Sequence, residues 1–289
     1  MRVIVIGASH AGIGFVDAMR RNEFYGELVL FDALVGQPLE RPPLSKEFLS
    51  ADGEDDGRFS LRKPEWFADN DIELVDGCRV TAIHPDARLV ETASGERMSY
   101  DRLVLAMGAT PRRLPAADGM DGVFELRHPD DAARLRAAAA NASSAIVIGG
   151  GYIGLEVAAT LAKSGKDVTV IEAAPRLLAR VASPAISAFF ADLHADAGTT
   201  VITDVGVEDI AADRGGFSHV TLSDGRQLSA DMLVVGIGVT PETALAEEAG
   251  IETGNGILVD VGMQTSMAGI YAIGDGALQR DSAYGIRIE

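Results

Sequence analysis

Two glycine-rich fingerprints in one chain constrain its fold more than any other feature. Residues 149–154 read Gly-Gly-Gly-Tyr-Ile-Gly and match G-x-G-x-x-G between a predicted apolar strand and a predicted helix. Residues 7–12 occupy the same place in an earlier strand–loop–helix pattern, although Ser9 stands at the second glycine position. Because each such loop binds the pyrophosphate of one dinucleotide, the repeat predicts a protein that holds two, usually a flavin and a nicotinamide.

The second fingerprint has every part that this type of site needs. Gly149 permits the tight turn, Gly151 leaves room for the pyrophosphate, and Gly154 lets the helix pack close to the strand. The phosphates would meet the free N–H groups at the positive end of the helix. Glu172 ends the next strand, roughly 20 residues on, and its carboxylate suits a ribose 2′-hydroxyl. Since a carboxylate repels a 2′-phosphate, the pattern favours NADH over NADPH.

The first fingerprint repeats this arrangement with changes. Gly7 and Gly12 correspond to the outer glycines of the second loop, and Asp32 corresponds to its acid. Ser9 is small, and its hydroxyl could bond a phosphate, so the loop can still serve as a dinucleotide site. The repeat indicates two related nucleotide-binding folds in tandem.

The remaining pattern predicts one domain inserted in the other. Strands are expected at 3–6, 72–75, 79–83, 89–92, 97–100, 103–106, 145–148, 167–171, 233–238, 256–260 and 270–275, with three short strands after residue 197; helices are expected from 63, at 128–140, at 155–163 and at 184–197. The last strands look like a return to the first domain. We therefore predict an α/β protein with two Rossmann-like dinucleotide-binding domains, one at 1–113 and 245–289 and one at 114–244. The family resemblance given below implies three β/β/α layers, an FAD domain for the first and an NAD domain for the second.

Composition excludes several classes of function. The net charge of −18 argues against nucleic acid or an anionic membrane as a partner. The single cysteine, Cys78, excludes a disulfide framework or a C-x-x-C redox pair, and the five histidines show no metal-ligand spacing, so no metal is expected. The chain begins directly in a strand, without a leader pattern, which favours a cytoplasmic location.

Two further motifs are candidates for cofactor contacts. Residues 41–46 read Arg-Pro-Pro-Leu-Ser-Lys, which is either a rigid surface turn or a stiff loop that carries Lys46 toward a cofactor. Gly274 and Asp275 follow an apolar strand, and the Asp275 carboxylate could bond a sugar-alcohol chain. A Gly-Asp turn is common, so this second motif gains weight only from its surroundings.

Together these motifs resemble the FAD- and NAD(P)-dependent pyridine nucleotide oxidoreductases. Within that family, residues 41–46, the run from Gly149 to Ala159 and the run 171–180 look like the ferredoxin reductases of oxygenase systems. Disulfide reductases of the same superfamily carry a redox cysteine in the region of residues 42–45, where this chain has none. The resemblance therefore excludes disulfide reductase chemistry.

The resemblance implies a role for each matching residue. The expected FAD contacts are Gly7, Ser9, Ala11, Gly12, Asp32, Arg41, Lys46, Val80, Ala106, Gly108, Arg127 and Asp275; the expected NAD contacts are Gly149, Gly151, Tyr152, Ile153, Gly154, Glu156, Glu172 and Gly238. Lys46 would lie near the reactive edge of the isoalloxazine and tune the flavin, and Glu156 would approach the nicotinamide end. Relatives often place the first-domain acid one residue after position 32.

The resemblance also implies a reaction and a partner. NADH would reduce FAD, which would pass electrons to a [2Fe–2S] ferredoxin of an oxygenase or P450 system, or to a rubredoxin. Two alternatives stay open: an NADH oxidase or quinone reductase of the same build, and a cofactor-binding fragment without turnover. The chain stops at Glu289 inside a family motif, and relatives continue into a third domain, so a C-terminal part is expected to be missing. The oligomeric state is left open.

Overall fold

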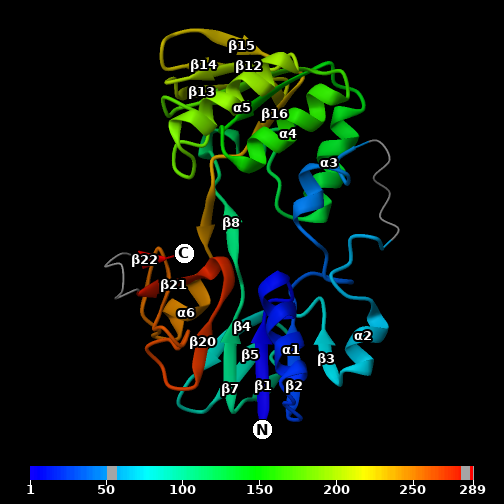
Figure 1. The fold of residues 1–289 in the computed structure, drawn as a ribbon, viewed down its shortest axis with the longest axis vertical. Helices are drawn as coiled ribbons and strands as arrows, with labels where there is room; N and C mark the ends of the chain where they lie inside the picture. Colours follow the sequence, from blue (N-terminus) through cyan, green and yellow to red (C-terminus); the bar gives the residue numbers. More distant parts are fainter. Residues whose placement is uncertain (51–56, 281–286, 289) are drawn as a thin grey trace. The chain divides into compact units, whose positions relative to one another are not determined.

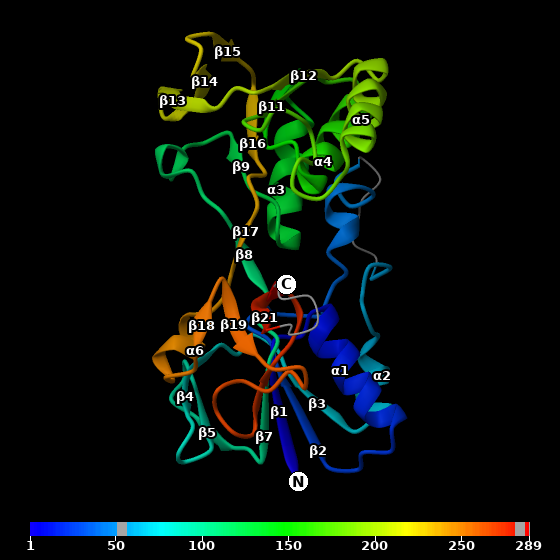
Figure 2. The same cartoon turned by 60° about the vertical axis from the view of Figure 1, so that its left-hand side comes forward.

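The computed structural model describes residues 1–50, 57–280 and 287–288. It separates into two compact units, each built on its own sheets (Figures 1 and 2). Unit 1 comprises Met1–Glu40, Gly57–Thr110 and Thr240–Glu289, and unit 2 comprises Arg41–Asp56 and Pro111–Val239. Residues 41–56, which the sequence prediction placed in the first domain, thus group with unit 2. Which cofactor each unit binds stays a prediction at this point.

Unit 1 is built on a parallel sheet of five strands in the order β20-β7-β1-β2-β3. These strands are β1 (Arg2–Ile6), β2 (Glu27–Phe31), β3 (Ile72–Val75), β7 (Arg102–Leu105) and β20 (Ile270–Ala272), with helices α1 (His10–Arg21), α2 (Pro64–Asp69) and α6 (Ala244–Glu248). An antiparallel sheet of β4 (Val80–His84), β5 (Leu89–Thr92) and β6 (Arg97–Ser99) forms a further layer. A four-stranded sheet contains β18 (Thr253–Gly254), β19 (Gly256–Val259), β21 (Ala277–Arg280) and β22 (Arg287–Ile288).

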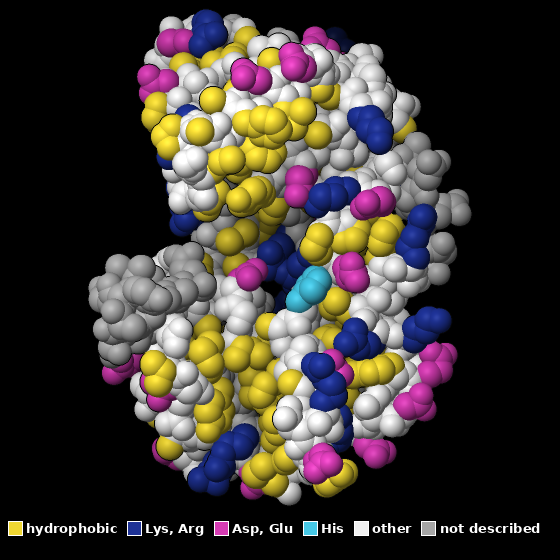
Figure 3. All heavy atoms as spheres, in the orientation of Figure 1, with side chains coloured by type: hydrophobic (Ala, Val, Ile, Leu, Met, Phe, Trp, Pro, Cys, Tyr) yellow, Lys and Arg dark blue, Asp and Glu magenta, His cyan; other side chains and the backbone are white. Residues whose placement is uncertain are grey.

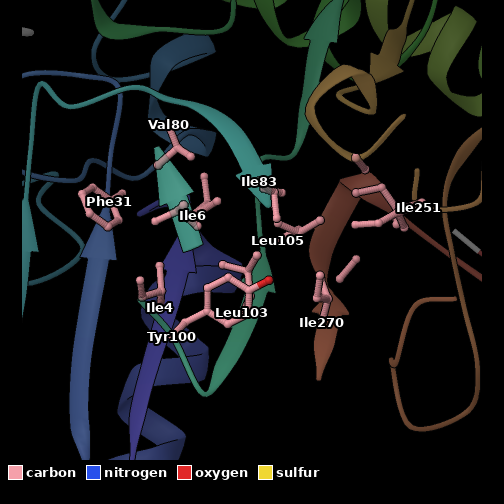
Figure 4. Close-up of a cluster of buried hydrophobic side chains, with 14 of the residues drawn as sticks. Ile4, Ile6, Phe31, Val80, Ile83, Tyr100, Leu103, Leu105, Ile251 and Ile270 are labelled. Atoms are coloured by element: carbon pink, nitrogen blue, oxygen red, sulfur yellow. The ribbon is translucent and has the colours of Figure 1, made fainter. Parts of the chain in front are cut away.

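The central strand β1 has side chains buried on both faces, as a parallel sheet covered on both sides requires. Val3 and Val5 pack with α1 and α2 on one face. Ile4 and Ile6 point to the other face, toward the antiparallel sheet (Figure 4). Successive residues of one short apolar run therefore serve two separate cores, which fixes the three layers of the unit.

Unit 2 repeats this plan. Its parallel sheet has the order β12-β11-β10-β16-β9, formed by β9 (Val123–Phe124), β10 (Ser144–Ile148), β11 (Asp167–Glu172), β12 (Thr200–Thr203) and β16 (Met232–Val235). The helices are α3 (Pro129–Ala139), α4 (Tyr152–Lys163) and α5 (Pro184–Asp196). An antiparallel sheet of β13 (Val207–Asp213), β14 (Gly216–Leu222) and β15 (Gln227–Ser229) lies on the opposite side from these helices in Figure 2.

Most predicted elements are present, with shifted ends. The second fingerprint helix begins at Tyr152 and not at 155, and residues 273–275, predicted as strand, leave the sheet for a 3₁₀ turn, η3 (Gly274–Gly276). The three short strands expected after residue 197 are four, β12 to β15. Residues 42–45 form a 3₁₀ helix, η1 (Pro42–Ser45), with its two prolines at the start.

Short strands β8 (Ala109–Pro111) and β17 (Val239–Pro241) pair with each other where the chain passes between the residue ranges of the two units. A third 3₁₀ turn, η2 (Pro115–Ala117), follows β8. Within the described parts of the chain, no helix combines the length and the apolar character that crossing a bilayer requires.

Candidate functional site: two dinucleotide loops

The first loop joins β1 to α1 and is shaped by close backbone contacts within unit 1. Gly7 has φ +110°, and a Cβ there would lie 2.3 Å from the Ala106 carbonyl oxygen. A Cβ on Gly12 would lie 1.9 Å from the Gly7 carbonyl oxygen. Any side chain at either glycine would therefore displace backbone. The Gly7 N–H donates to the Phe31 carbonyl at 2.8 Å, which ties the loop to the end of β2.

The same loop approaches the predicted FAD residues near the end of the chain. A Cβ on Gly274 would lie 2.7 Å from the Ala11 Cβ, which places Asp275 beside the start of α1. A Cβ on Gly276 would lie 3.1 Å from the Gly108 carbonyl oxygen. The structure thus brings together Ala11, Ala106, Gly108 and Asp275 with the first loop, although they are far apart in the sequence.

The start of α1 is suited to an anion. Ser9 is its N-cap, yet among the described residues the Ser9 side-chain oxygen accepts no capping hydrogen bond from a first-turn N–H. The first turn contains no acidic side chain. The N–H groups at this helix end are therefore suited to phosphate oxygens, and the role predicted for Ser9 stays a prediction.

Two other predicted FAD residues lie beyond the loop in unit 1. Asp32 follows β2, and its Oδ1 accepts a hydrogen bond of 3.1 Å from the Leu34 N–H. The Cys78 N–H donates to the Asp32 carbonyl at 2.8 Å, which connects this acid to the segment before β4. Val80 is buried at the start of β4.

The second loop joins β10 to α4 and has nearly the same backbone geometry. Gly149 has φ +108°, and a Cβ there would lie 2.3 Å from the Gly236 carbonyl oxygen. A Cβ on Gly154 would lie 2.0 Å from the Gly149 carbonyl oxygen. By contrast, a Cβ on Gly151 would have no atom within 4 Å. The space above Gly151 is open, as a loop that admits a pyrophosphate requires.

The Glu172 carboxylate supports this loop directly. Its Oε2 accepts a hydrogen bond of 2.6 Å from the Gly150 N–H, and its Oε1 accepts one of 2.7 Å from the Ala174 N–H. Hydrogen bonds to a charged acceptor are stronger than those between neutral groups. Glu172 therefore holds the loop in place, while its predicted contact with a ribose stays a prediction.

A cleft of about 460 Å³ opens above the second loop within unit 2. Among the predicted NAD residues, those that line it are Gly149, Gly151, Tyr152, Ile153, Glu172 and Gly238. Tyr152 and Ile153 are exposed at the start of α4, where apolar side chains can contact the coenzyme. The cleft is large enough for a substantial part of a dinucleotide.

Lys46 and Glu156 form an ion pair in unit 2. The Lys46 ammonium lies 2.8 Å from Glu156 Oε2, and the Ser45 hydroxyl donates to the same oxygen at 2.5 Å. One turn along α4, the Thr160 hydroxyl donates to the Ser45 carbonyl at 2.7 Å. The segment after η1 is therefore fastened to the fingerprint helix, which places the predicted flavin-tuning lysine and the predicted nicotinamide-end glutamate in contact.

Arg41 and Arg127, the other predicted FAD residues of unit 2, line one small cavity of about 40 Å³ together with Ile153. The Arg127 N–H donates to the Asp131 carboxylate at 3.1 Å, so the start of α3 holds its backbone. Their positions beside each other and beside the second fingerprint were not expected from the sequence.

Three residues in or beside the second loop were missed by sequence reasoning. A Cβ on Gly150 would lie 2.6 Å from the Leu177 side chain, so a larger residue there would have to displace Leu177; the run of three glycines was the available signal. Gly236 supplies the carbonyl against Gly149, but it lies far along the chain. Arg180 lines the coenzyme cleft and provides a positive charge suited to phosphate.

The fold and the two loops define a protein built to hold two dinucleotides, one in each unit. The chain belongs to the pyridine nucleotide-disulphide oxidoreductase family, whose pattern matches residues 1–286. This confirms the predicted fold class and the resemblance from which the cofactors FAD and NAD were expected.

Individual relatives make the comparison more specific. The chain is 39% identical over 281 residues to a ferredoxin–NAD(P)(+) reductase of Sphingomonas, covering 97% of the chain and 68% of the relative. It is 42% identical over 274 residues to the ferredoxin reductase subunit of 5,5′-dehydrodivanillate O-demethylase of Sphingobium, covering 94% and 66%. The solved covalent putidaredoxin reductase–putidaredoxin complex matches with a TM-score of 0.94 at 36% identity, covering 100% of this chain and 70% of that one. The chain thus spans about two thirds of the length of these relatives.

Proposed function

We propose that the protein is an NADH-dependent flavoprotein reductase that delivers electrons to a [2Fe–2S] ferredoxin of an oxygenase or P450 system. The observation that carries the proposal is the pair of fingerprint loops with matching backbone geometry in one chain. The names of the relatives support the acceptor, because a ferredoxin reductase subunit of an O-demethylase is among them. We also propose a cytoplasmic location, where NADH is supplied.

The chemistry that the two cofactors would supply when bound is transfer of a hydride from NADH to FAD and release of the two electrons one at a time. The first loop would hold the FAD pyrophosphate on the N–H groups of α1, with Ala11, Ala106 and Gly108 against it. Asp275, beside Ala11, would accept hydrogen bonds from the ribityl hydroxyls. These residues bind and orient, so no acid–base residue is required in unit 1.

The second loop would hold NADH. Gly151 leaves room for the pyrophosphate, and Arg180 would neutralise part of its charge. The Glu172 carboxylate would accept a hydrogen bond from the adenosine 2′-hydroxyl and repel a 2′-phosphate, which supports the preference for NADH. Catalysis would then depend on positioning the two cofactors, since a well-oriented pair removes much of the entropic barrier.

The test is an anaerobic visible spectrum of the purified chain with added FAD, before and after NADH. Bands of bound oxidised flavin that bleach on NADH addition are expected. A panel of acceptors follows: a [2Fe–2S] ferredoxin, a rubredoxin, oxygen and a quinone. Faster turnover with oxygen or quinone than with either iron protein would overturn the proposed acceptor, and protein that binds NADH but no flavin would overturn the reductase activity of this chain.

Lys46 offers a sharper test of the flavin site. Lys46→Met removes the ammonium that pairs with Glu156 at 2.8 Å, and we expect flavin reduction by NADH to slow by about tenfold, or ~1.4 kcal/mol. Stopped-flow measurement of flavin bleaching checks this, with the exposed Lys63→Met as the matched control. Reduction as fast as in the unchanged protein would exclude a role for Lys46.

A further inference from the structure

Helix α5 of unit 2 has an inverted distribution of polar and apolar side chains. Its buried residues are Ser187 and His194, seven positions apart on one face. Ile186, Phe189 and Leu193 are 48%, 59% and 50% exposed. A helix on the surface of a monomer normally buries its apolar stripe and exposes its polar one. The packing of unit 2 therefore does not account for the apolar side chains on the outward face of α5.

The polar inward face has a structural reason. The Ser187 hydroxyl donates to the Leu177 carbonyl at 2.6 Å and accepts a hydrogen bond of 2.7 Å from Arg176 Nη1. The same guanidinium group donates to the carbonyls of Ala179 and Ala182, so it ties the loop before α5 to the helix. These bonds explain why serine faces inward, but they place no demand on the outward face.

The outward side chains form one continuous stripe. Positions 186, 189 and 193 follow the i, i+3, i+7 spacing that places residues on the same side of a helix. Val181, 60% exposed, lies a few residues before the helix. In Figure 3, hydrophobic side chains gather over the part of unit 2 where Figure 1 shows α5. Contiguous apolar patches of this kind mark interaction sites on soluble proteins.

The charges of α5 indicate what covers the stripe. The first turn contains no acidic residue, whereas the exposed Asp192 and Asp196 lie near the C-terminal end. Negative charge is unfavourable at a helix C-terminus and favourable at an N-terminus. A second α5 packed antiparallel would place the two acids of each copy beside the N-terminal end of the other, which corrects the unfavourable placement in both.

The spacing of the stripe fits the same arrangement. Along the helix, Ile186 and Leu193 are equally far from the midpoint between Phe189 and Phe190. The rings of these two phenylalanines pack edge to face, with their centroids 5.7 Å apart. In an antiparallel pair, Ile186 of each copy therefore faces Leu193 of the other. A two-fold axis through the midpoint makes the surface self-complementary, as a symmetric dimer requires.

We propose that the outward face of α5 is a homodimer interface, on which two copies of this chain pack α5 against α5 in antiparallel orientation. A helix of 13 residues is about 20 Å long, so the pair buries less than the roughly 800 Å² per partner of a standard interface. We therefore expect a reversible dimer with a dissociation constant on the order of micromolar.

The test is sedimentation equilibrium of the full chain over a range of concentrations. The unchanged protein is expected to dimerise, and Phe189→Glu is expected to weaken the dimer by about 30-fold or more, since it charges the centre of the interface. The matched control is Val261→Glu, at an apolar position of unit 1 that is 74% exposed. Circular dichroism and NADH binding confirm that each variant is folded.

A charge exchange tests the antiparallel geometry. Ile186→Lys and Leu193→Asp alone should each weaken the dimer, whereas the double variant should recover it, because each new lysine faces a new aspartate of the other copy. A chain that is monomeric at all concentrations would overturn the proposal, and so would a dimer that Phe189→Glu leaves unchanged. Failure of the double variant to recover would overturn the antiparallel pairing.

Discussion

The two fingerprint loops have the same backbone and different linings. Gly7 and Gly149 have φ values of +110° and +108°, and a Cβ on either would lie 2.3 Å from a carbonyl oxygen of a neighbouring strand end. At the second glycine position, however, unit 1 has Ser9 and unit 2 has Gly151. Both loops have glycine at the positions that pack against backbone, while the position with open space in unit 2 carries a serine in unit 1. Close packing within each unit thus accounts for the glycines that the two loops share.

The acidic side chains at the ends of β2 and β11, Asp32 and Glu172, form different hydrogen bonds. Asp32 and Glu172 each accept a hydrogen bond from the N–H two residues on, at 3.1 and 2.7 Å. Glu172 has one methylene more, and its second oxygen also accepts from the Gly150 N–H in the loop. The second loop is therefore held to its acid by a direct hydrogen bond, so Glu172 supports the loop in addition to the specificity role that we propose for it.

The largest expected effect comes from replacing the first glycine of each loop, which should affect the binding of a different cofactor in each case. Gly149→Ala should weaken NADH binding by about 100-fold or more, or ~2.7 kcal/mol, because its Cβ meets the Gly236 carbonyl, while bound flavin is kept. Gly7→Ala should lose flavin instead. Fluorescence titration and the flavin spectrum measure both. Gly198→Ala is the control, since Gly198 has φ +85° but no neighbouring atom within 4 Å. Loss of flavin in Gly149→Ala would reverse the assignment of the loops.

A smaller effect is expected at Glu172. Glu172→Gln replaces one acceptor oxygen by an N–H₂ group, so the carboxylate can no longer accept from both backbone N–H groups. The ratio of NADPH to NADH dissociation constants should fall by about tenfold, or ~1.4 kcal/mol, because the repulsion of a 2′-phosphate is also lost. Calorimetric titration with both coenzymes checks this against Glu208→Gln, an exposed position on β13. An unchanged ratio would show that Glu172 does not read the ribose.

Exchanging the residue types at the second glycine position, with Gly151→Ser in one variant and Ser9→Gly in another, tests whether this position lies next to the dinucleotide. Gly151→Ser should weaken NADH binding by about five- to tenfold, or ~1 kcal/mol, because the hydroxymethyl group enters space that the pyrophosphate needs. Ser9→Gly should change flavin binding less, since it only removes a hydroxyl. Equilibrium titrations of both variants provide the comparison. NADH affinity equal to that of the unchanged protein in Gly151→Ser would mean that the coenzyme does not pass over this residue.

The smallest effect concerns stability. Burial lowers the pKa of His194 in unit 2, whereas none of the buried residues that the structure describes in unit 1 is a histidine. As the pH falls below about 6.5, the unfolded chain takes up the proton first. This contribution to stability is therefore fully present above that pH and decreases as the pH falls toward the lower folded-state pKa.

Urea unfolding at pH 7.5 and 5.5 should show this loss for unit 2. His194→Gln should reduce the pH dependence, whereas the exposed His10→Gln in unit 1 should leave it as it is. Equal pH dependence in His194→Gln and the unchanged protein would assign the loss to other groups.

The sequence predicted those parts of the site that local pattern encodes. Gly7, Gly12, Gly149 and Gly154 were identified because the fingerprint expresses close backbone approach within one strand–loop–helix unit. Gly236 was not identified, since the carbonyl that it places against Gly149 comes from a strand far along the chain. Contacts of this kind depend on strand order, which a local pattern does not contain.

Two other features were not predicted. Residues 41–46 were expected in the first domain, whereas Ser45 and Lys46 bond to α4 of unit 2, which lies far along the chain. The α5 helix was predicted with nearly correct ends, but its buried face was not, because the bonds of Ser187 to Arg176 and Leu177 outweigh the apolar pattern.

The two hydrogen bonds of Glu172 have a consequence for protein engineering. Attempts to convert such a protein to NADPH would begin by removing this carboxylate. In this chain that change also removes the acceptor of the Gly150 N–H, so the glycine turn loses the hydrogen bond that holds it to β11. A successful conversion must therefore supply a replacement acceptor for that N–H together with a positive charge for the new phosphate, so the smallest workable redesign involves two positions chosen jointly.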